Sequence, residues 1–174
     1  MKFFSGFSLK NDREFFLNYI KESQYTVAGF SYGAIKAFEA VEEALKNKER
    51  VDTLQLFSPA FFQTKSPQFK KLQMRAYTKD EALYMQNFIR GCFTPYKVQK
   101  VQHKKHSLEE LEELLFYEWS RSKLVEMRDQ GVCFEVYLGG EDRITDVEAA
   151  REFFKEFATV TYIKNANHFL QRGE

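Results

Sequence analysis

Short runs rich in β-branched and aromatic residues alternate along this chain with longer segments of helical spacing. Candidate strands lie at residues 3–4, 25–28, 53–57, 133–138 and 159–163. Strands separated by helices are typical of βαβ units, so the pattern predicts an α/β fold with a mainly parallel sheet. A chain of 174 residues is about one domain's worth. We therefore expect a single domain over residues 1–174.

The connection between the third and fourth strands is unusually long, at about 75 residues. Residues 61–130 are therefore expected to form a helical insertion that roofs one edge of the sheet. Its last part, residues 107–130, reads as one helix. Asn11, Ser107 and Thr145 each precede a glutamate by three residues, which is the spacing of a capping box at a helix start.

Polar residues alternate with apolar ones in the strands, as at Thr26, Gln55 and Glu135. A parallel sheet covered on both faces would show nearly continuous apolar runs. If the strands lie in chain order, right-handed crossovers place the connecting helices on one face. We expect the other face to be at least partly open to solvent or covered by a second subunit, as in a homo-oligomer.

The sharpest motif is the sequence GFSYG at residues 29–33, which follows one candidate strand and opens a helix. In such a G-x-S-x-G turn the serine hydroxyl is presented at the end of the strand, and the glycines avoid backbone collisions. Ser31 is therefore the candidate nucleophile. An inactive relative that keeps the motif remains an alternative.

A nucleophilic serine needs a histidine base. The chain has three histidines, and His103 and His106 lie in the insertion, where a solvated surface role is favoured. His168 follows the last strand, at the edge of the sheet expected to hold Ser31. It is the candidate base.

The candidate acid follows the fourth strand in the sequence GGEDRITD at residues 139–146. Glu141 and Asp146 compete with Asp142 for this role. We favour Asp142, because the glycine pair turns the chain back across the sheet edge and Asp146 reads as an acid at a helix start. The order Ser, Asp, His is that of the α/β-hydrolase fold.

An oxyanion hole needs two backbone N–H donors. One comes from the residue after the nucleophile, here Tyr32, and we assign the other to Phe7, after the turn at Gly6.

Charge is unevenly distributed, although the net charge is only +1. Residues 61–106 hold ten bases and two acids, a local charge of +8, which leaves −7 for the rest of the chain. Lys70, Lys71 and Arg75 should form a positive patch for an anionic partner. The helical spacing of the aromatic residues in the insertion favours a place in the core for most of them, and some should line an acyl channel. The acidic cluster 109–113 reads as a solvated face.

Other classes are disfavoured. No nucleic-acid motif or glycine-rich phosphate loop is present. No apolar run reaches the roughly 18 residues of a membrane span, which favours a cytoplasmic protein. Cys92 and Cys133 form no CxxC pair, so reduced thiols and no metal or other cofactor are expected.

Five segments together resemble the α/β hydrolases, and more closely the small pimeloyl-acyl-carrier-protein methyl ester esterases of the BioV type. They are FFSGF, GFSYGAIKA, LQLFSPAF, GGEDRITD and NHFLQ. The resemblance implies a reduced α/β-hydrolase fold, a catalytic triad of Ser31, Asp142 and His168, and oxyanion donors at Phe7 and Tyr32.

It also implies an activity and a partner. The activity is hydrolysis of the methyl ester of a pimeloyl chain, giving the free acid and methanol in biotin synthesis. The partner is the acyl carrier protein that holds this chain. A thioesterase or general short-chain esterase, and a carrier-binding relative without turnover, are the alternatives.

Overall fold

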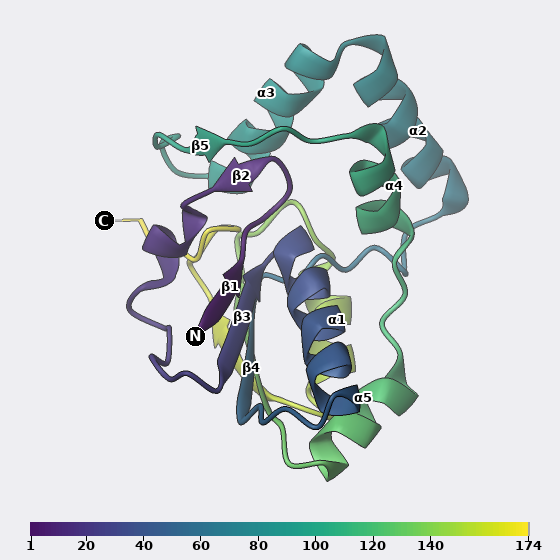
Figure 1. The fold of residues 1–174 in the computed structure, drawn as a ribbon. Helices are drawn as coiled ribbons and strands as arrows, with labels where there is room; N and C mark the ends of the chain where they lie inside the picture. The colour runs from purple at the N-terminus through teal and green to yellow at the C-terminus, as the bar shows by residue number, and fades with distance from the viewer. Residues whose placement is uncertain (174) are drawn as a thin grey trace.

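The computed structural model describes residues 1–173 and contains one five-stranded, fully parallel sheet (Figure 1). Its strand order follows the chain: β1 (Lys2–Phe4), β3 (Thr26–Phe30), β4 (Thr53–Phe57), β6 (Cys133–Gly139) and β7 (Thr159–Ile163). The five predicted strands and the α/β class are confirmed. A two-stranded antiparallel ladder joins β2 (Leu9–Lys10) to β5 (Gln102–His103).

Helices α1 (Tyr32–Lys46) and α6 (Val147–Phe154) pack on one face of the sheet. The core between them contains Leu54, Leu56 and Val136 from the strands, all fully buried. Trp119 joins the two helices, because its ring lies 5.4 Å from that of Phe38 and 5.1 Å from that of Phe154. For these two connections the arrangement is the one that right-handed crossovers between strands in chain order produce. The connection from β1 to β3 departs from this expectation, because its 3₁₀ helix lies on the opposite face.

The opposite face is less open than the sequence predicts. The 3₁₀ helix η1 (Asp12–Phe16) covers its centre, where the Phe16 ring lies 4.8 Å from the ring of Phe57. Gln55 is fully buried, because its amide bonds the backbone of Tyr19 and Lys21 in the segment after η1, each at 2.9 Å. The expectation of a solvated Gln55 is therefore wrong.

Thr26 is also buried, at 2% exposure, which corrects the same expectation at that position. The face is open toward the outer strands: Cys133 of β6 and Thr159 and Thr161 of β7 are exposed, and Glu135 is half-buried and bonded to Lys21. A polar residue in a strand thus marks a solvated face only where no loop returns to bond it.

Four helices connect β4 to β6: α2 (Pro67–Lys79), α3 (Glu81–Phe93), α4 (Leu108–Phe116) and α5 (Arg121–Asp129). Figure 1 shows α2, α3 and α4 together beyond the carboxyl ends of the strands, whereas α5 lies beside the far end of α1. A single helix over 107–130 is wrong, because the chain breaks after α4 to bury Trp119, whose indole N–H donates to the Ala60 carbonyl at 2.8 Å. Ser120 then caps α5.

The predicted helix starts have different outcomes. Ser107 caps α4 by accepting a bond from the Glu110 N–H at 3.2 Å, as expected. Asn11 makes no side-chain cap bond at η1. The cap of α6 is Asp146 and not Thr145, whose hydroxyl accepts from the Phe61 N–H instead. Within residues 1–173, no helix has both the length and the apolar character that crossing a bilayer requires.

Candidate active site

Ser31 lies in the tight turn between β3 and α1. Its backbone has φ 54° and ψ −115°, and its N–H donates to the Phe57 carbonyl of the neighbouring strand at 2.9 Å. The turn also needs Gly33, because a Cβ there would lie 2.1 Å from the carbonyl oxygen of Phe4 in β1. These contacts hold the serine at the carboxyl edge of the sheet in a left-handed conformation that non-glycine residues rarely adopt.

His168 lies in the loop after β7 and reaches both partners predicted for it. Its Nε2 is 3.0 Å from the Ser31 Oγ, and its Nδ1 is 2.6 Å from the Asp142 Oδ2. All three residues are at most 8% exposed. The structure thus brings Ser31, His168 and Asp142 into one buried chain of hydrogen bonds.

Of the three candidate acids in the loop after β6, Asp142 is the one that contacts His168. The other carboxylate oxygen of Asp142 accepts the backbone N–H groups of Ile144 at 2.7 Å and Thr145 at 3.3 Å, which aims the carboxylate at His168. Asp146 caps α6 and accepts the Thr64 hydroxyl at 2.7 Å. Glu141 contributes a backbone bond to the histidine loop and no side-chain bond within residues 1–173.

The turn at Gly139 places the acid beside the histidine loop. A Cβ at Gly139 would lie 2.4 Å from the carbonyl oxygens of Ala166 and Asn167, so only glycine allows this approach.

Cys92 packs close enough for the Asp142 charge to act on it. Burial first, and that negative charge second, raise the pKa of the Cys92 thiol, which keeps the thiol neutral.

The two expected oxyanion donors have no competing partner. Within the described chain, neither the Phe7 N–H nor the Tyr32 N–H donates a hydrogen bond to a protein acceptor. Tyr32 is the first residue of α1, so its N–H is one of the unpaired donors at a helix start, where negative charge is stabilised.

The Tyr32 side chain belongs to a cluster that the sequence analysis missed. Its hydroxyl donates to Glu113 Oε2 of α4 at 2.5 Å, and Lys36 of α1 bonds the other oxygen of Glu113. Burial opposes ionisation of Glu113, but the hydrogen bonds from Lys36 and Tyr32 outweigh it and lower the pKa of its carboxyl. A solvated role for Glu113 is therefore wrong, because it ties α4 to the helix that follows Ser31.

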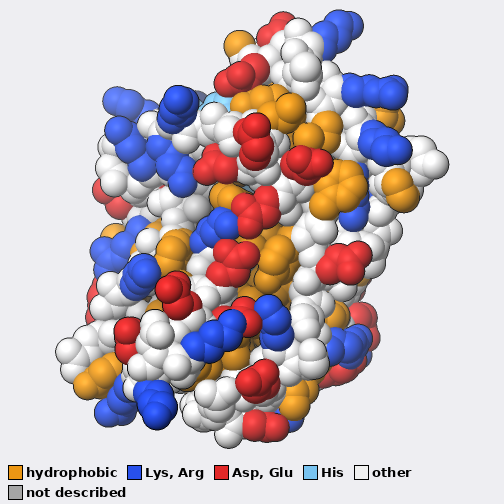
Figure 2. Space-filling model, turned by 45° about the vertical axis from the view of Figure 1, so that its right-hand side comes forward, with side chains coloured by type: hydrophobic (Ala, Val, Ile, Leu, Met, Phe, Trp, Pro, Cys, Tyr) orange, Lys and Arg blue, Asp and Glu red, His pale blue; other side chains and the backbone are white. Residues whose placement is uncertain are grey.

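The predicted positive patch is corrected at one residue. Lys70 is only 7% exposed, and its ammonium lies 5.2 Å from the centre of the Phe116 ring, so it joins α2 to α4. Lys71 and Arg75 are exposed. Figure 2 shows further Lys and Arg side chains gathered at the upper left of the molecule, near a surface histidine. His103 is exposed in β5, whereas His106 is partly buried.

Two cavities flank α3. One, of about 410 Å³, lies between α2, α3 and α4 and is lined by Phe62, Phe88, Leu111 and Ile144 among others. The other, of about 690 Å³, lies between α3 and residues 98–106. No group of three or more potential metal ligands gathers anywhere in residues 1–173.

The fold has clear relatives among solved structures, although no protein-family model and no curated protein matches the sequence. BioG from Haemophilus influenzae superposes with a TM-score of 0.58 at 10% identity, over 97% of this chain and 87% of that one. Naproxen esterase from Bacillus subtilis gives 0.51 at 21% identity, over 83% and 53%. An esterase from Exiguobacterium antarcticum gives 0.52 at 15%, over 82% and 59%.

The chain therefore spans about half the length of the B. subtilis structures it matches. Its five parallel strands, the serine turn between β3 and α1, and the superposition on these proteins lead to one conclusion. The chain has an α/β-hydrolase fold in reduced form.

Proposed function

We propose that the chain is a serine carboxylesterase whose nucleophile is Ser31. The observation that carries the proposal is the hydrogen-bonded chain from Ser31 Oγ through His168 to Asp142. An imidazole held at 3.0 Å can accept the hydroxyl proton as the serine attacks, and a buried carboxylate at its other nitrogen stabilises the imidazolium that forms.

The reaction has two halves. Ser31 Oγ bonds to the ester carbonyl carbon while its proton passes to His168 Nε2, and the carbonyl oxygen becomes an oxyanion that accepts the N–H groups of Phe7 and Tyr32. The carbon–alkoxide bond then breaks and His168 protonates the leaving alcohol. In the second half, His168 deprotonates a water that attacks the acyl-serine, releasing the acid and restoring the serine hydroxyl.

We assign the acyl chain to the cavity of about 410 Å³ between α2, α3 and α4. Its lining is mostly aromatic and aliphatic, and its volume lies in the range of small-ligand pockets. Ile144 both lines this cavity and donates its N–H to the Asp142 carboxylate, so the cavity begins two residues from the candidate acid.

The proposed substrate is the methyl ester of a pimeloyl chain on acyl carrier protein. Two findings support it: the sequence resemblance of five segments to esterases of that type, and the superposition on BioG over nearly the whole of both chains. The exposed bases Lys71 and Arg75 on α2 suit an acidic carrier.

The test is mass spectrometry of methyl pimeloyl-carrier protein after incubation with the protein. We expect the carrier to lose one methylene in mass, with the thioester intact, and Ser31→Ala to abolish the change. Loss of the whole acyl group would instead identify a thioesterase. Turnover of small soluble esters alone would identify a general short-chain esterase.

Labelling with a fluorophosphonate probe separates these enzymes from a relative without turnover, since only an activated serine reacts. We expect labelling of the wild type and none of Ser31→Ala. An unlabelled wild type that leaves every ester intact would refute the proposal.

A further inference from the structure

The oxyanion loop between β1 and η1 is a tight turn closed by its own backbone. The Leu9 N–H donates to the Gly6 carbonyl at 3.1 Å. In the planar trans peptide between Gly6 and Phe7, the C=O and the N–H point in opposite directions. The bond from Leu9 therefore fixes not only the Gly6 carbonyl but also the direction of the Phe7 N–H.

Two groups outside the turn hold it in place. The carboxylate of Asp12, 2% exposed, accepts the Gly6 N–H at 2.8 Å. On the other side, the Ser8 carbonyl accepts the backbone N–H of Lys104 at 2.8 Å, and Leu9 pairs with His103 in the β2–β5 ladder. The second support comes from the insertion, about 95 residues further along the chain.

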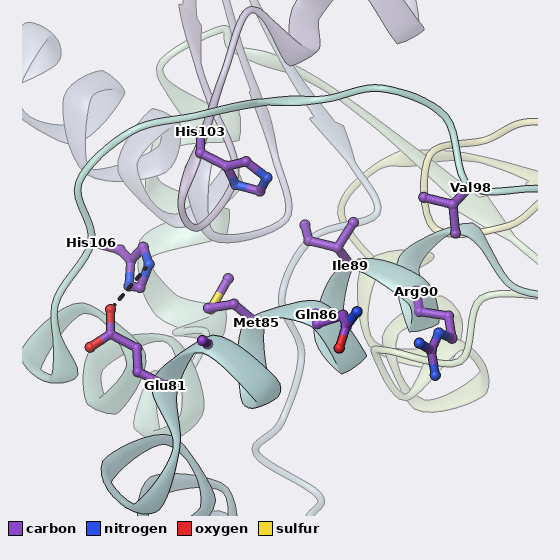
Figure 3. A pocket seen from close by; sticks show the side chains of 9 residues that line it. Glu81, Met85, Gln86, Ile89, Arg90, Val98, His103 and His106 are labelled. Atoms are coloured by element: carbon purple, nitrogen blue, oxygen red, sulfur yellow. Dashed lines mark ion pairs between the residues drawn. The ribbon is translucent and has the colours of Figure 1, made fainter.

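Residues 97–106, here called the strap, reach this turn across a cavity. Figure 3 shows the strap passing over α3, with Met85, Ile89 and Arg90 of that helix lining the space of about 690 Å³ beneath it. Because side chains do not fill this space, the path of the strap depends on the contacts that residues 102–106 make on either side of it.

The far attachment of the strap is His106. Its Nδ1 lies 2.8 Å from the Tyr77 hydroxyl of α2, and its Nε2 lies 3.6 Å from the Glu81 carboxylate of α3. The His106 ring also packs 5.3 Å from the ring of Phe7. The strap thus connects the helices of the insertion to the residue whose N–H is the expected oxyanion donor.

We propose that the strap, through the Lys104 backbone N–H, and Asp12 are positioning elements that aim the Phe7 N–H at the ester carbonyl. This inference rests on the proposed function and assigns the insertion a part in transition-state stabilisation in addition to substrate binding. Loss of either support lets the Gly6–Phe7 peptide rotate, so the oxyanion loses one aligned donor while the acyl cavity keeps its lining.

The experiment compares Lys104→Pro, which removes the backbone N–H, with Lys104→Ala, which keeps it. Lys105→Pro is a second control, because the Lys105 N–H makes no bond in the described chain. Complete loss of one oxyanion donor costs roughly 100- to 1000-fold in kcat. For a misaligned donor we expect a fall of about 10- to 100-fold in kcat for Lys104→Pro, with KM nearly unchanged and both controls near wild type.

A second pair of variants tests the same turn if Lys104→Pro does not fold. Asp12→Ala should lower kcat in the same way, and Asp12→Asn, which keeps an oxygen acceptor for the Gly6 N–H, should restore most of it. Affinity for an alkyl trifluoromethyl ketone, whose serine adduct carries an oxyanion, should fall in parallel with kcat. A merely structural role would lower the unfolding temperature of Asp12→Ala but leave kcat and the affinity for the ketone near their wild-type values in the folded protein.

The outcomes separate the inference from the function it rests on. A wild type that neither labels with a fluorophosphonate nor hydrolyses any ester overturns the proposed function and the inference with it. An active wild type with unchanged kcat in both Lys104→Pro and Asp12→Ala overturns the inference alone. Equal losses in Lys104→Ala and Lys104→Pro, or a change confined to KM, also overturn it.

Discussion

The role of Asp142 can be tested by the single substitution Asp142→Asn, because the loop around it should survive. The Asn carbonyl oxygen can still accept the N–H groups of Ile144 and Thr145, which now bond Asp142 Oδ1. Its NH₂ group then faces His168 Nδ1, where the carboxylate oxygen lies at 2.6 Å. A donor at that place forces the histidine proton onto Nε2, the nitrogen that must accept the proton of Ser31.

The magnitude follows from the charge that is lost. An imidazolium and a carboxylate about 4 Å apart attract each other by about 4 kcal/mol at an effective dielectric constant near 20. At about 1.36 kcal/mol per factor of ten, this corresponds to roughly a thousandfold in kcat. The wrong tautomer adds to the loss, and the same substitution in serine protease triads costs roughly 10⁴-fold. We therefore expect Asp142→Asn to lower kcat for a small soluble ester by at least three orders of magnitude.

The matched control is Asp146→Asn, four residues along the same loop. Asp146 caps α6 and accepts the Thr64 hydroxyl, so its loss should cost about 1 kcal/mol of stability or less. Its kcat should remain near wild type. The assay is steady-state hydrolysis beside thermal unfolding by circular dichroism. A folded Asp142→Asn protein that keeps more than a tenth of its kcat, or a folded Asp146→Asn protein without activity, would refute the assignment of the acid.

Three further predictions follow from the packing and charge of the site. Gly33→Ala should lower the unfolding temperature by several degrees, because the new methyl group would lie 2.1 Å from a backbone oxygen of β1; an unchanged melting curve would contradict this. The carboxyl of Glu113 has a lowered pKa, so its stabilising effect is present above about pH 4.5 and lost as pH falls through the folded value. Glu113→Gln should therefore flatten the fall of unfolding temperature below about pH 4.5, and parallel curves would argue against the ion pair. Lys71→Glu with Arg75→Glu should slow hydrolysis of the carrier-bound ester and weaken its salt dependence, without affecting a small ester. Lys48→Glu, at the far end of α1, is the control, and equal losses on both esters would indicate a structural role.

The sequence predicted the features that local chemistry determines. A strand, the GFSYG turn and a helix follow one another within a few residues, so the position of Ser31 could be read directly. His168 and Asp142 follow later strands, and the carboxyl ends of parallel strands share one edge. Chain order and parallel pairing were therefore enough to bring the three side chains to the same edge.

The features that the sequence did not predict depend on contacts between distant segments. The sequence predicted a solvated Gln55. In the structure, the segment after η1 bonds both the NH₂ group and the carbonyl oxygen of its side chain. Lys70 was predicted to be a surface base, but its ammonium lies over the ring of Phe116, the last residue of α4. Composition and spacing give no signal for either contact.

The contact between the strap and the turn after β1 is the clearest example. The ladder of the strap with β2 has only two residue pairs, and Gln102 and His103, which form β5, are polar and exposed, so neither alternation nor apolar character marks them as a strand. The basic charge of residues 61–106, which include the strap, suggested a partner outside the molecule. The backbone of the same segment nevertheless has a partner inside it, the Ser8 carbonyl.

The geometry of the candidate site depends on backbone contacts across the sheet edge more than on the size of the sheet. Gly33 lets the serine turn lie against the end of β1, and Gly139 lets the acid loop lie against the histidine loop after β7. Each contact joins two segments that carry different parts of the site, and each leaves no space for a methyl group. Five strands supply all of these strand ends, although naproxen esterase, which matches 83% of this chain, is the longer protein. The same reasoning applies to the proposed oxyanion loop, which leaves β1 at the edge of the described sheet. Its turn has no neighbouring strand on the outer side in residues 1–173, and Asp12 and the strap supply hydrogen bonds to it instead.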